Sequence, residues 1–303
     1  MTKVSVCIPA YLHVDLLERC IQSVLAQNFK DFEVVVTDDS PNDIIQERIK
    51  LYQDDRIRYF KNVQTLGSPA NWNECVLKAK GEYIKILHHD DWFSTPFSLG
   101  TYVDLLNDHP ESDIAFSASC DISASYQKVH SITPAVCKKI SEQPESLFLG
   151  NVIGAPSVSI FRNNKNLLFD TQLIWLVDTD FYIRSLQQNH QFAYTNNVLV
   201  NIGISDFQIT RSCLEKPEVR IKEKLYLYKK FELEKKQSIY KRSLLRTLGR
   251  EKIFSNSKLG HIIPECKENV FRPLDSFKAY YFYTKKKIRE ILVLVIGGRN
   301  LSA

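Results

Sequence analysis

The stretch that decides the fold is Ile84-Lys-Ile-Leu-His-His-Asp-Asp-Trp92, an apolar run that ends in two adjacent carboxylates. The run is typical of a buried β-strand, and strand pairing stops where a strand ends, so Asp90 and Asp91 should lie at a sheet edge. Two like charges side by side repel, and burying them without a cation is costly. A divalent ion with oxygen ligands, itself carrying substrate phosphates, removes that cost. The stretch therefore predicts a metal site, although an Asp pair can also cap a following helix.

A second carboxylate pair follows another strand-like run. Phe32-Glu-Val-Val-Val-Thr37 leads directly into Asp38 and Asp39. Two strand ends that each present a carboxylate pair predict one polar cleft for a metal-bound nucleotide. The alternative is simple turn chemistry before a helix, for which Asp is well suited.

The first part of the chain alternates strand and helix signals. Helical stretches of this length between strands indicate βαβ units, and so an α/β fold with a mostly parallel sheet and helices on both faces. In such sheets ligands bind outside the carboxyl ends of the strands, where both acidic pairs fall. The expected strands are 3–8, 32–37, 56–60 and 82–87, and the expected helices are 14–28, 42–53 and 70–79.

The second part is less regular. We expect a helix over 96–107, strands over 113–118 and 157–161, a polar loop over 121–145 and a helix within 173–186. From about residue 213 the chain is rich in Lys, Glu and Tyr and is expected to be mostly helical.

The net charge of +5 over 303 residues hides a division. Residues 1–210 hold 17 basic and 25 acidic residues, whereas residues 211–303 hold 23 basic and 10 acidic ones. The basic tail points to an anionic partner, either lipid headgroups or nucleic acid. It contains no recognisable nucleic-acid-binding module, and the acidic body disfavours that partner.

Cysteine usage and hydropathy bear on the compartment. The seven cysteines are scattered, without a CxxC pair, which favours a reducing cytosol over a disulfide framework or a zinc site. No run of about 18 apolar residues predicts a membrane-spanning helix. The N-terminus leads straight into a strand-like run, so we expect no signal peptide.

Two further candidates lie near predicted element ends. Tyr11, at the end of the first strand, could stack on a nucleobase, or it could be a partly buried aromatic beside the sheet. Asp178 follows the apolar Leu173-Ile-Trp-Leu-Val177, a setting that could raise its pKa and suit a general base. Asp178 and Asp180 could equally belong to the polar face or first turn of a helix.

Taken in order, these pieces resemble the family 2 inverting glycosyltransferases, which have a GT-A fold, and in particular members that build bacterial cell-surface polysaccharides. The resemblance covers roughly residues 3–212. The stretches that carry it are Val4-Ser-Val-Cys-Ile-Pro-Ala-Tyr11, Ser23-Val-Leu-Ala-Gln27, Phe32-Glu-Val-Val-Val-Thr-Asp-Asp-Ser40, Asn71-Trp-Asn73, Ala79-Lys-Gly-Glu-Tyr-Ile84 and Leu87-His-His-Asp-Asp91.

The resemblance implies a role for each matching position. Pro9, Ala10 and Tyr11 would line the base pocket, and Asp39 would hydrogen-bond the uracil. Asp90 would face the ribose or the diphosphate, Asp91 would ligate Mn²⁺ or Mg²⁺, and Asp178, ahead of Arg184, would be the catalytic base.

The sequence departs from the family pattern in three places. Leu12 stands where Asn usually follows the Tyr, and Val177-Asp178 stands where the family has Glu-Asp. Gly203 and Ser205 appear where the family often has an Arg and then a His that helps hold the metal or diphosphate. The third protein contact to the metal is therefore open: His88, His89 or water could supply it.

The resemblance also implies an organisation and an activity. Residues 1–212 would form the transferase domain, with a nucleotide-binding half (1–110) and an acceptor-binding half (111–212), followed by a basic helical region (213–303). The enzyme would move a sugar from a nucleoside-diphosphate sugar, with UDP favoured, to a glycan acceptor in O-antigen, capsule or exopolysaccharide assembly. The alternative is a catalytically inactive sugar-nucleotide-binding or scaffold protein of the same fold. A dinucleotide-dependent oxidoreductase is excluded because the turn Pro9-Ala-Tyr-Leu-His13 has no glycine.

The tail suggests where this reaction would occur. Lys285-Lys-Lys-Ile-Arg289 adjoins the apolar Ile291-Leu-Val-Leu-Val-Ile296, a pattern that suits an interfacial helix on anionic lipid. A solvated packing helix is the alternative. If the tail binds lipid, the protein would be cytoplasmic and peripheral on the inner face of the cell membrane, and the acceptor would be a polyprenyl-diphosphate-linked glycan.

Overall fold

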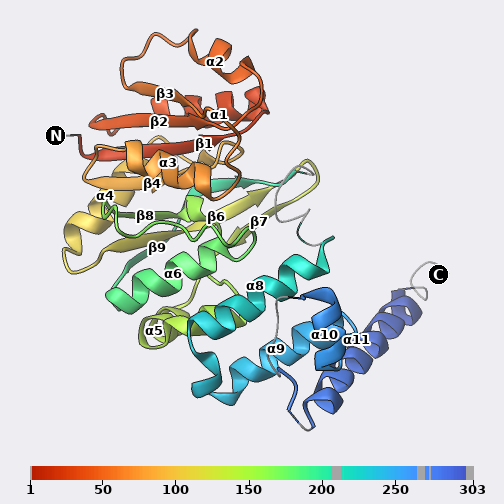
Figure 1. Ribbon diagram of the computed structural model, residues 1–303. Coiled ribbons are helices and arrows are strands. Elements are labelled where there is room, and N and C mark those ends of the chain that lie inside the picture. Colours follow the sequence, from red (N-terminus) through yellow and green to blue (C-terminus); the bar gives the residue numbers. More distant parts are fainter. Residues whose placement is uncertain (1, 206–212, 214, 265–269, 273, 298–303) are drawn as a thin grey trace. The chain divides into compact units, whose positions relative to one another are not determined.

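The chain falls into two units, Met1–Gln208 and Ile209–Ala303. The structure, a computed structural model, describes residues 2–205, 213, 215–264, 270–272 and 274–297, with residues 288–297 as helix backbone only. Figure 1 shows the elements of both units.

Four parallel strands form the first half of the sheet in the first unit, in the order β3 (Ile57–Lys61), β2 (Phe32–Asp38), β1 (Val4–Ala10) and β4 (Tyr83–Ile86). Every residue of β1 and β2 is buried, which explains why their sequences are mostly apolar rather than alternating between apolar and polar residues. The connections run through α1 (Val14–Leu25), α2 (Ile44–Ile49) and α3 (Ala70–Lys78). The predicted α/β class with a parallel first half is confirmed.

The second half of the same sheet is mixed. Strand β8 (Ser159–Arg162) pairs antiparallel with both β4 and β6 (Ile114–Ile122), and β6 pairs parallel with β9 (Ala193–Gly203). The short β5 (Trp92–Phe93) pairs with β9 and so places the chain just after Asp91 beside the end of β9. Helices α4 (Ser98–Asp108) and α6 (Val177–Gln188) flank this half (Figure 1).

The predicted loop over 121–145 is wrong. This segment contains β7 (Gln127–His130), which pairs with β6, and α5 (Pro134–Glu142). All four residues of β7 are exposed, and Ile140 is the one buried residue of α5, so neither element carries a clear apolar pattern. Strand β9 was not predicted either. Its exposed Asn196 and Asn197 lie at an irregularity in the pairing with β6.

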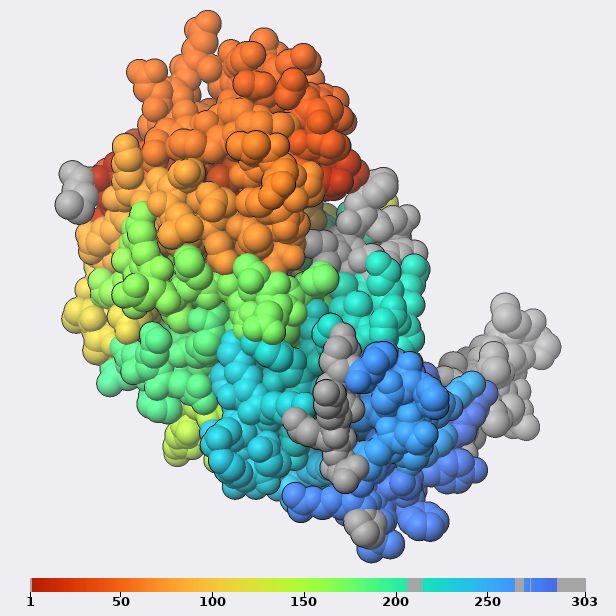
Figure 2. Space-filling view, in the orientation of Figure 1, coloured from red at the N-terminus to blue at the C-terminus, as the bar shows by residue number. Residues whose placement is uncertain are grey.

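The second unit is helical, with α8 (Pro217–Lys230), α9 (Ser238–Arg250), α10 (Asn256–Ile262) and α11 (Asp275–Gly297). Helices α9 and α11 pack so closely that a Cβ on Gly249 would overlap the carbonyl oxygen of Ala279. In the space-filling view the dark blue residues of α11 lie at the surface of this unit (Figure 2). Across the parts of the chain that the structure describes, no helix has both the length and the apolar character needed to span a membrane.

Candidate active site

The carboxyl ends of β1, β2 and β4 meet at one edge of the sheet, because the three strands are parallel neighbours. Pro9 and Ala10 close β1 and are buried, whereas Tyr11, just beyond the strand, is 43% exposed. The ring of Tyr11 is therefore accessible at this edge, as stacking on a nucleobase requires. The base-pocket roles of all three residues remain predictions.

Asp39, at the end of β2, holds a loop. Its carboxylate accepts hydrogen bonds from the backbone N–H groups of Leu66 and Gly67 and from Asn62 Nδ2, each with a donor–acceptor distance of 2.8 Å. An ionised carboxylate has about four acceptor positions. These three donors leave one acceptor position unfilled on a residue that is 3% exposed, and the uracil contact stays a prediction.

Asp38 is buried and is hydrogen-bonded within the protein. Its side chain is wholly buried and accepts hydrogen bonds from Tyr59 Oη (2.7 Å), Lys61 Nζ (3.1 Å) and the backbone N–H of Ser40 (2.8 Å). These contacts join the ends of β2 and β3, as the turn-chemistry interpretation of this residue expects.

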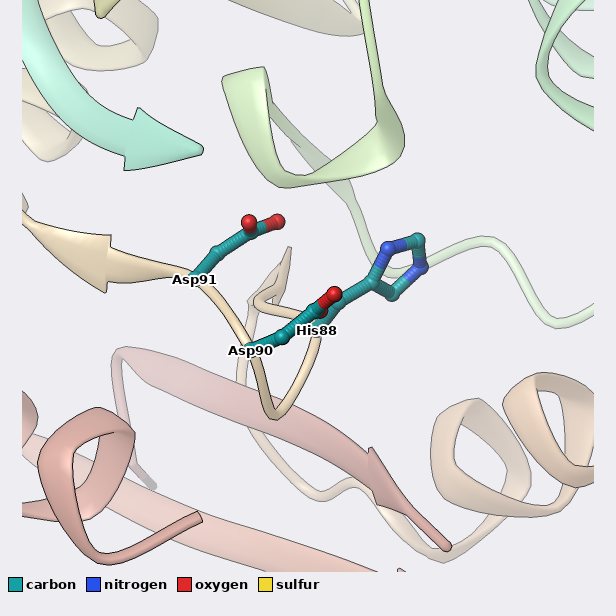
Figure 3. Close-up of side chains that lie close together, drawn as sticks. All are labelled: His88, Asp90 and Asp91. Carbon is teal, nitrogen blue, oxygen red and sulfur yellow. The ribbon is translucent and has the colours of Figure 1, made fainter. Parts of the chain in front are cut away.

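His88, Asp90 and Asp91 form a cluster on one turn of chain after β4 (Figure 3). Each offers one ligand atom, and these atoms lie within 4.8 Å of one another. Burial raises the pKa of Asp91 well above its usual range, and the charge of Asp90 raises it further. Two crowded carboxylates with an adjacent imidazole fit a divalent ion with oxygen and nitrogen ligands, because such an ion relieves this repulsion.

Contacts from two other elements, β9 and α1, fix this turn. The backbone N–H of Gly203, at the end of β9, donates a 3.0 Å hydrogen bond to Asp91 Oδ1. Arg19, on α1, donates to the backbone carbonyl of Asp90 over 2.8 Å and lies 3.7 Å from the ring centroid of Trp92. A Cβ on Gly203 would overlap the carbonyl oxygen of Asp90, so this departure from the family pattern has a local packing reason. Neither contact was predicted from the sequence.

The two histidines of the turn have different surroundings. The ring of His88 lies 4.5 Å from that of Trp72, and its backbone N–H donates to Ser157 Oγ over 3.0 Å. Burial lowers the pKa of His88 to about 4, so its imidazole is neutral at pH 7 and a nitrogen lone pair is available. His89 instead lies parallel to His13, with the ring centroids 6.3 Å apart. His88 rather than His89 belongs to the cluster.

A lysine lies buried in the strand that leads to the acidic turn. Lys85, on β4, has no exposed surface, and its Nζ donates to the carbonyl oxygens of Ile86 (3.1 Å), Ser159 (3.2 Å) and Ser157. Burial lowers the pKa of Lys85 to about 7, and the charge of Asp91 opposes this shift. This residue was not among the predicted site residues, although a charged residue inside an apolar strand is itself a signal.

Asp178 lies in the first turn of α6 and is half-buried. Its Oδ2 accepts a 2.8 Å hydrogen bond from Asn151 Nδ2, and its Oδ1 accepts one of 2.7 Å from the backbone N–H of Thr179. Burial raises the pKa of Asp178 to about 6, with these hydrogen bonds opposing the shift. A carboxylate in this range can accept a proton near neutral pH.

Asp180 has the opposite surroundings. It is wholly buried and forms an ion pair with Arg184, with Nε and Oδ2 2.7 Å apart. Asp178 is therefore the better candidate for a base. Ser205 has a buried hydroxyl, and the rest of the stretch 201–210 considered above, from residue 206, lies outside the described residues.

One short segment connects the two halves of the site. Asn151, at its start, holds Asp178, and Ser157, at its end, accepts the hydrogen bond from the backbone of His88. The candidate base and the acidic cluster are thus attached to opposite ends of the same stretch, which is at most about 25 Å long when extended.

Comparisons with known proteins identify the family of this chain. Residues 5–164 match the model of glycosyl transferase family 2. An uncharacterized glycosyltransferase of Methanocaldococcus jannaschii is 30% identical over 216 residues, which is 70% of this chain and 72% of that protein. The UDP-Glc:alpha-D-GlcNAc-diphosphoundecaprenol beta-1,3-glucosyltransferase WfaP of Escherichia coli is 38% identical over 100 residues, 32% of this chain and 39% of that protein.

A solved structure shares the fold. The crystal structure of S. aureus TarS in complex with UDP-GlcNAc matches with a TM-score of 0.62 at 17% identity, over 88% of this chain and 77% of that one. The first unit thus has the GT-A fold. On the family match over more than half of its length, this chain belongs to glycosyl transferase family 2.

Proposed function

We propose that this protein is an inverting glycosyltransferase that moves a sugar from a UDP-sugar to a lipid-linked glycan in bacterial surface polysaccharide assembly. The observation that carries the proposal is the environment of Asp178, a half-buried carboxylate that Asn151 orients and whose pKa is about 6. Such a group is suited to remove a proton from an acceptor hydroxyl.

The reaction is a single displacement. The acceptor oxygen attacks the anomeric carbon while Asp178 takes its proton, and the bond from that carbon to the diphosphate oxygen breaks, its electron pair leaving with the nucleoside diphosphate. General base catalysis contributes about 10²–10⁴-fold, and the positioning of two bound substrates contributes much of the rest. One displacement inverts the anomeric centre, so an α-linked donor gives a β-linked product.

The nucleotide would lie along the carboxyl edge of β1, β2 and β4. Tyr11 would stack on the base, above Pro9 and Ala10, and Asp39 would accept the base N–H. Asp90 and Asp91, with His88, would hold Mn²⁺ or Mg²⁺, which when bound supplies positive charge opposite the leaving diphosphate. In this assignment residues 1–110 bind the donor and residues 111–212 bind the acceptor.

The acceptor would be polyprenyl-diphosphate-linked. The name of the WfaP relative states an acceptor of this kind, linked to diphosphoundecaprenol. A membrane-linked acceptor also suits a protein whose residues 211–303 carry a net charge of +13. The basic region would hold the protein on the anionic inner face of the cell membrane. The products would be O-antigen, capsule or exopolysaccharide intermediates.

The test is sugar transfer with purified full-length protein. UDP-glucose, UDP-N-acetylglucosamine and GDP-mannose would be offered with a prenyl-diphosphate-linked N-acetylglucosamine acceptor, with Mn²⁺, Mg²⁺ or EDTA, and the anomeric configuration would be read by NMR. We expect transfer with a UDP-sugar, inversion, and loss of at least about 10²-fold in Asp178→Asn. Nucleotide binding without transfer from any donor would instead favour the inactive scaffold.

A further inference from the structure

The start of α11 presents an apolar face to solvent. Phe277 and Tyr281 are 75% and 57% exposed, and Leu274, which immediately precedes the helix, is 67% exposed. Residues four apart lie on one side of a helix, so Phe277 and Tyr281 form one patch. Large apolar side chains that are exposed together mark a binding surface more often than single exposed ones do.

The exposure does not come from a helix that lacks a packing partner. Ala279, on the other side of α11, is wholly buried against Gly249 of α9, and Arg246 of α9 lies 5.5 Å from the ring centroid of Phe282. The helix is thus anchored on one side, and its aromatic side faces outward.

Lysines border the apolar patch. Lys278 and Lys285 are exposed, and each lies four residues after an apolar member of the patch, Leu274 and Tyr281 respectively. The unit that carries them has 23 basic and 10 acidic residues in 211–303. The face therefore combines aromatic side chains with positive charge, in a setting that is itself strongly basic.

We propose that this aromatic–lysine face, formed by Leu274, Phe277, Lys278, Tyr281 and Lys285, binds the surface of an anionic lipid bilayer. Aromatic rings prefer the headgroup level of a membrane, and an amphipathic helix lies in that plane with basic side chains against lipid phosphates. A second copy of the chain is the weaker fit, because two such basic faces would repel each other. The proposal rests on the proposed function, since it brings the transferase to a lipid-linked acceptor.

The experiment is co-sedimentation of the full chain with phosphatidylcholine vesicles, with and without phosphatidylglycerol. The variants are Phe277→Ser with Tyr281→Ser, and Lys278→Glu with Lys285→Glu. The matched control is Tyr126→Ser with Val129→Ser, which removes two apolar side chains that are 47% and 59% exposed on the first unit. Circular dichroism checks that each variant folds.

We expect binding to the anionic vesicles only, and weaker binding at high salt. Partitioning onto the anionic vesicles should fall at least about tenfold in the aromatic variant and roughly fivefold for each lysine replaced in the lysine variant. The control variant should partition like wild type. Absence of wild-type binding, or an aromatic variant that sediments like wild type, would overturn the proposal. So would a wild-type dimer, seen by light scattering, that the aromatic variant converts to monomer without any vesicle binding.

Transfer to a water-soluble acceptor, measured without vesicles, separates this proposal from the proposed function. The aromatic and lysine variants of α11 should keep that activity, since neither alters the candidate active site. If wild type binds vesicles but transfers no sugar, the lipid face stands and the transferase proposal fails.

Discussion

Asn151 donates a 2.8 Å hydrogen bond to Oδ2 of Asp178 and another of 2.9 Å to the carbonyl oxygen of Gly154. The carbonyl oxygen of its own side chain accepts the backbone N–H groups of Ile153 and Gly154, so the amide is fixed at both ends. Asn151 is thereby a positioning residue for the candidate base. It also favours the charged form of Asp178, because its bond is made to the carboxylate.

The first prediction concerns the pH profile of sugar transfer. Because the pKa of Asp178 is about 6, kcat/KM should rise with pH through about 6 and then level off. Asn151→Ala removes a hydrogen bond to the charged form, so this acid limb should move to higher pH by about one pKa unit. Asn196→Ala, an exposed asparagine on β9, is the control. An unmoved limb in Asn151→Ala would contradict the role of Asp178.

The fold was largely predictable because its first half obeys local rules. Strands β1 and β2 are buried along their whole length and are mostly apolar, and the helix between them carries a clear apolar stripe, formed by Leu17, Cys20, Ile21 and Val24 in α1. Strand β7 and helix α5 were not predictable in this way. They lie mostly exposed, and tertiary pairing rather than an apolar pattern holds them.

The candidate site was predictable only where its residues are adjacent in the sequence. Asp90 and Asp91 can be recognised because they are a carboxylate pair that follows a strand-like run. Arg19 and Gly203 act through contacts with residues far away in the sequence, and Asn151 reaches Asp178 across 27 positions. One sequence cannot reveal which distant backbone group will meet a given carboxylate.

The second prediction concerns Gly203. A Cβ at this position would overlap the carbonyl oxygen of Asp90, and backbone cannot move aside as a flexible side chain can. Gly203→Ala should therefore lower the free energy of unfolding by roughly 1–3 kcal/mol and weaken metal binding. Gly100→Ala, on α4, is the control, because its Cβ would meet only Phe29 at an ordinary 3.8 Å. Urea denaturation and Mn²⁺ titration measure the two effects, and equal behaviour of the variants would contradict the packing argument.

The third prediction concerns Lys85 and the pH dependence of stability. The pKa of Lys85 is about 7 in the folded protein, against 10.5 as its ordinary value. Between these two pH values the unfolded chain binds a proton that the folded chain does not, so this group makes the free energy of unfolding rise with pH. The destabilisation caused by burying charged Lys85 is fully present below about pH 7. Each pKa unit corresponds to about 1.4 kcal/mol. The difference in unfolding free energy between wild type and Lys85→Met should therefore change from pH 7 to pH 10, whereas a constant difference would show that Lys85 titrates normally.

The last prediction separates the two carboxylates of the acidic turn. Burial and the charge of Asp90 raise the pKa of Asp91, because both make its charged form unfavourable in the metal-free protein. Asp91→Asn keeps an oxygen that can accept the N–H of Gly203 but removes this charge, and the metal-free variant should be more stable than wild type by on the order of 1 kcal/mol.

The free energy of unfolding of wild type should rise by about 2.7 kcal/mol with Mn²⁺ at a hundred times its Kd, whereas that of Asp91→Asn and Asp90→Asn should rise far less. Thermal unfolding with EDTA and then with excess Mn²⁺ measures both effects, and Asp104→Asn, an exposed aspartate on α4, is the control. If Asp91→Asn kept the full response to Mn²⁺, Asp91 would be a structural carboxylate held by Gly203, and Asp90 with His88 would remain as the candidate ligands.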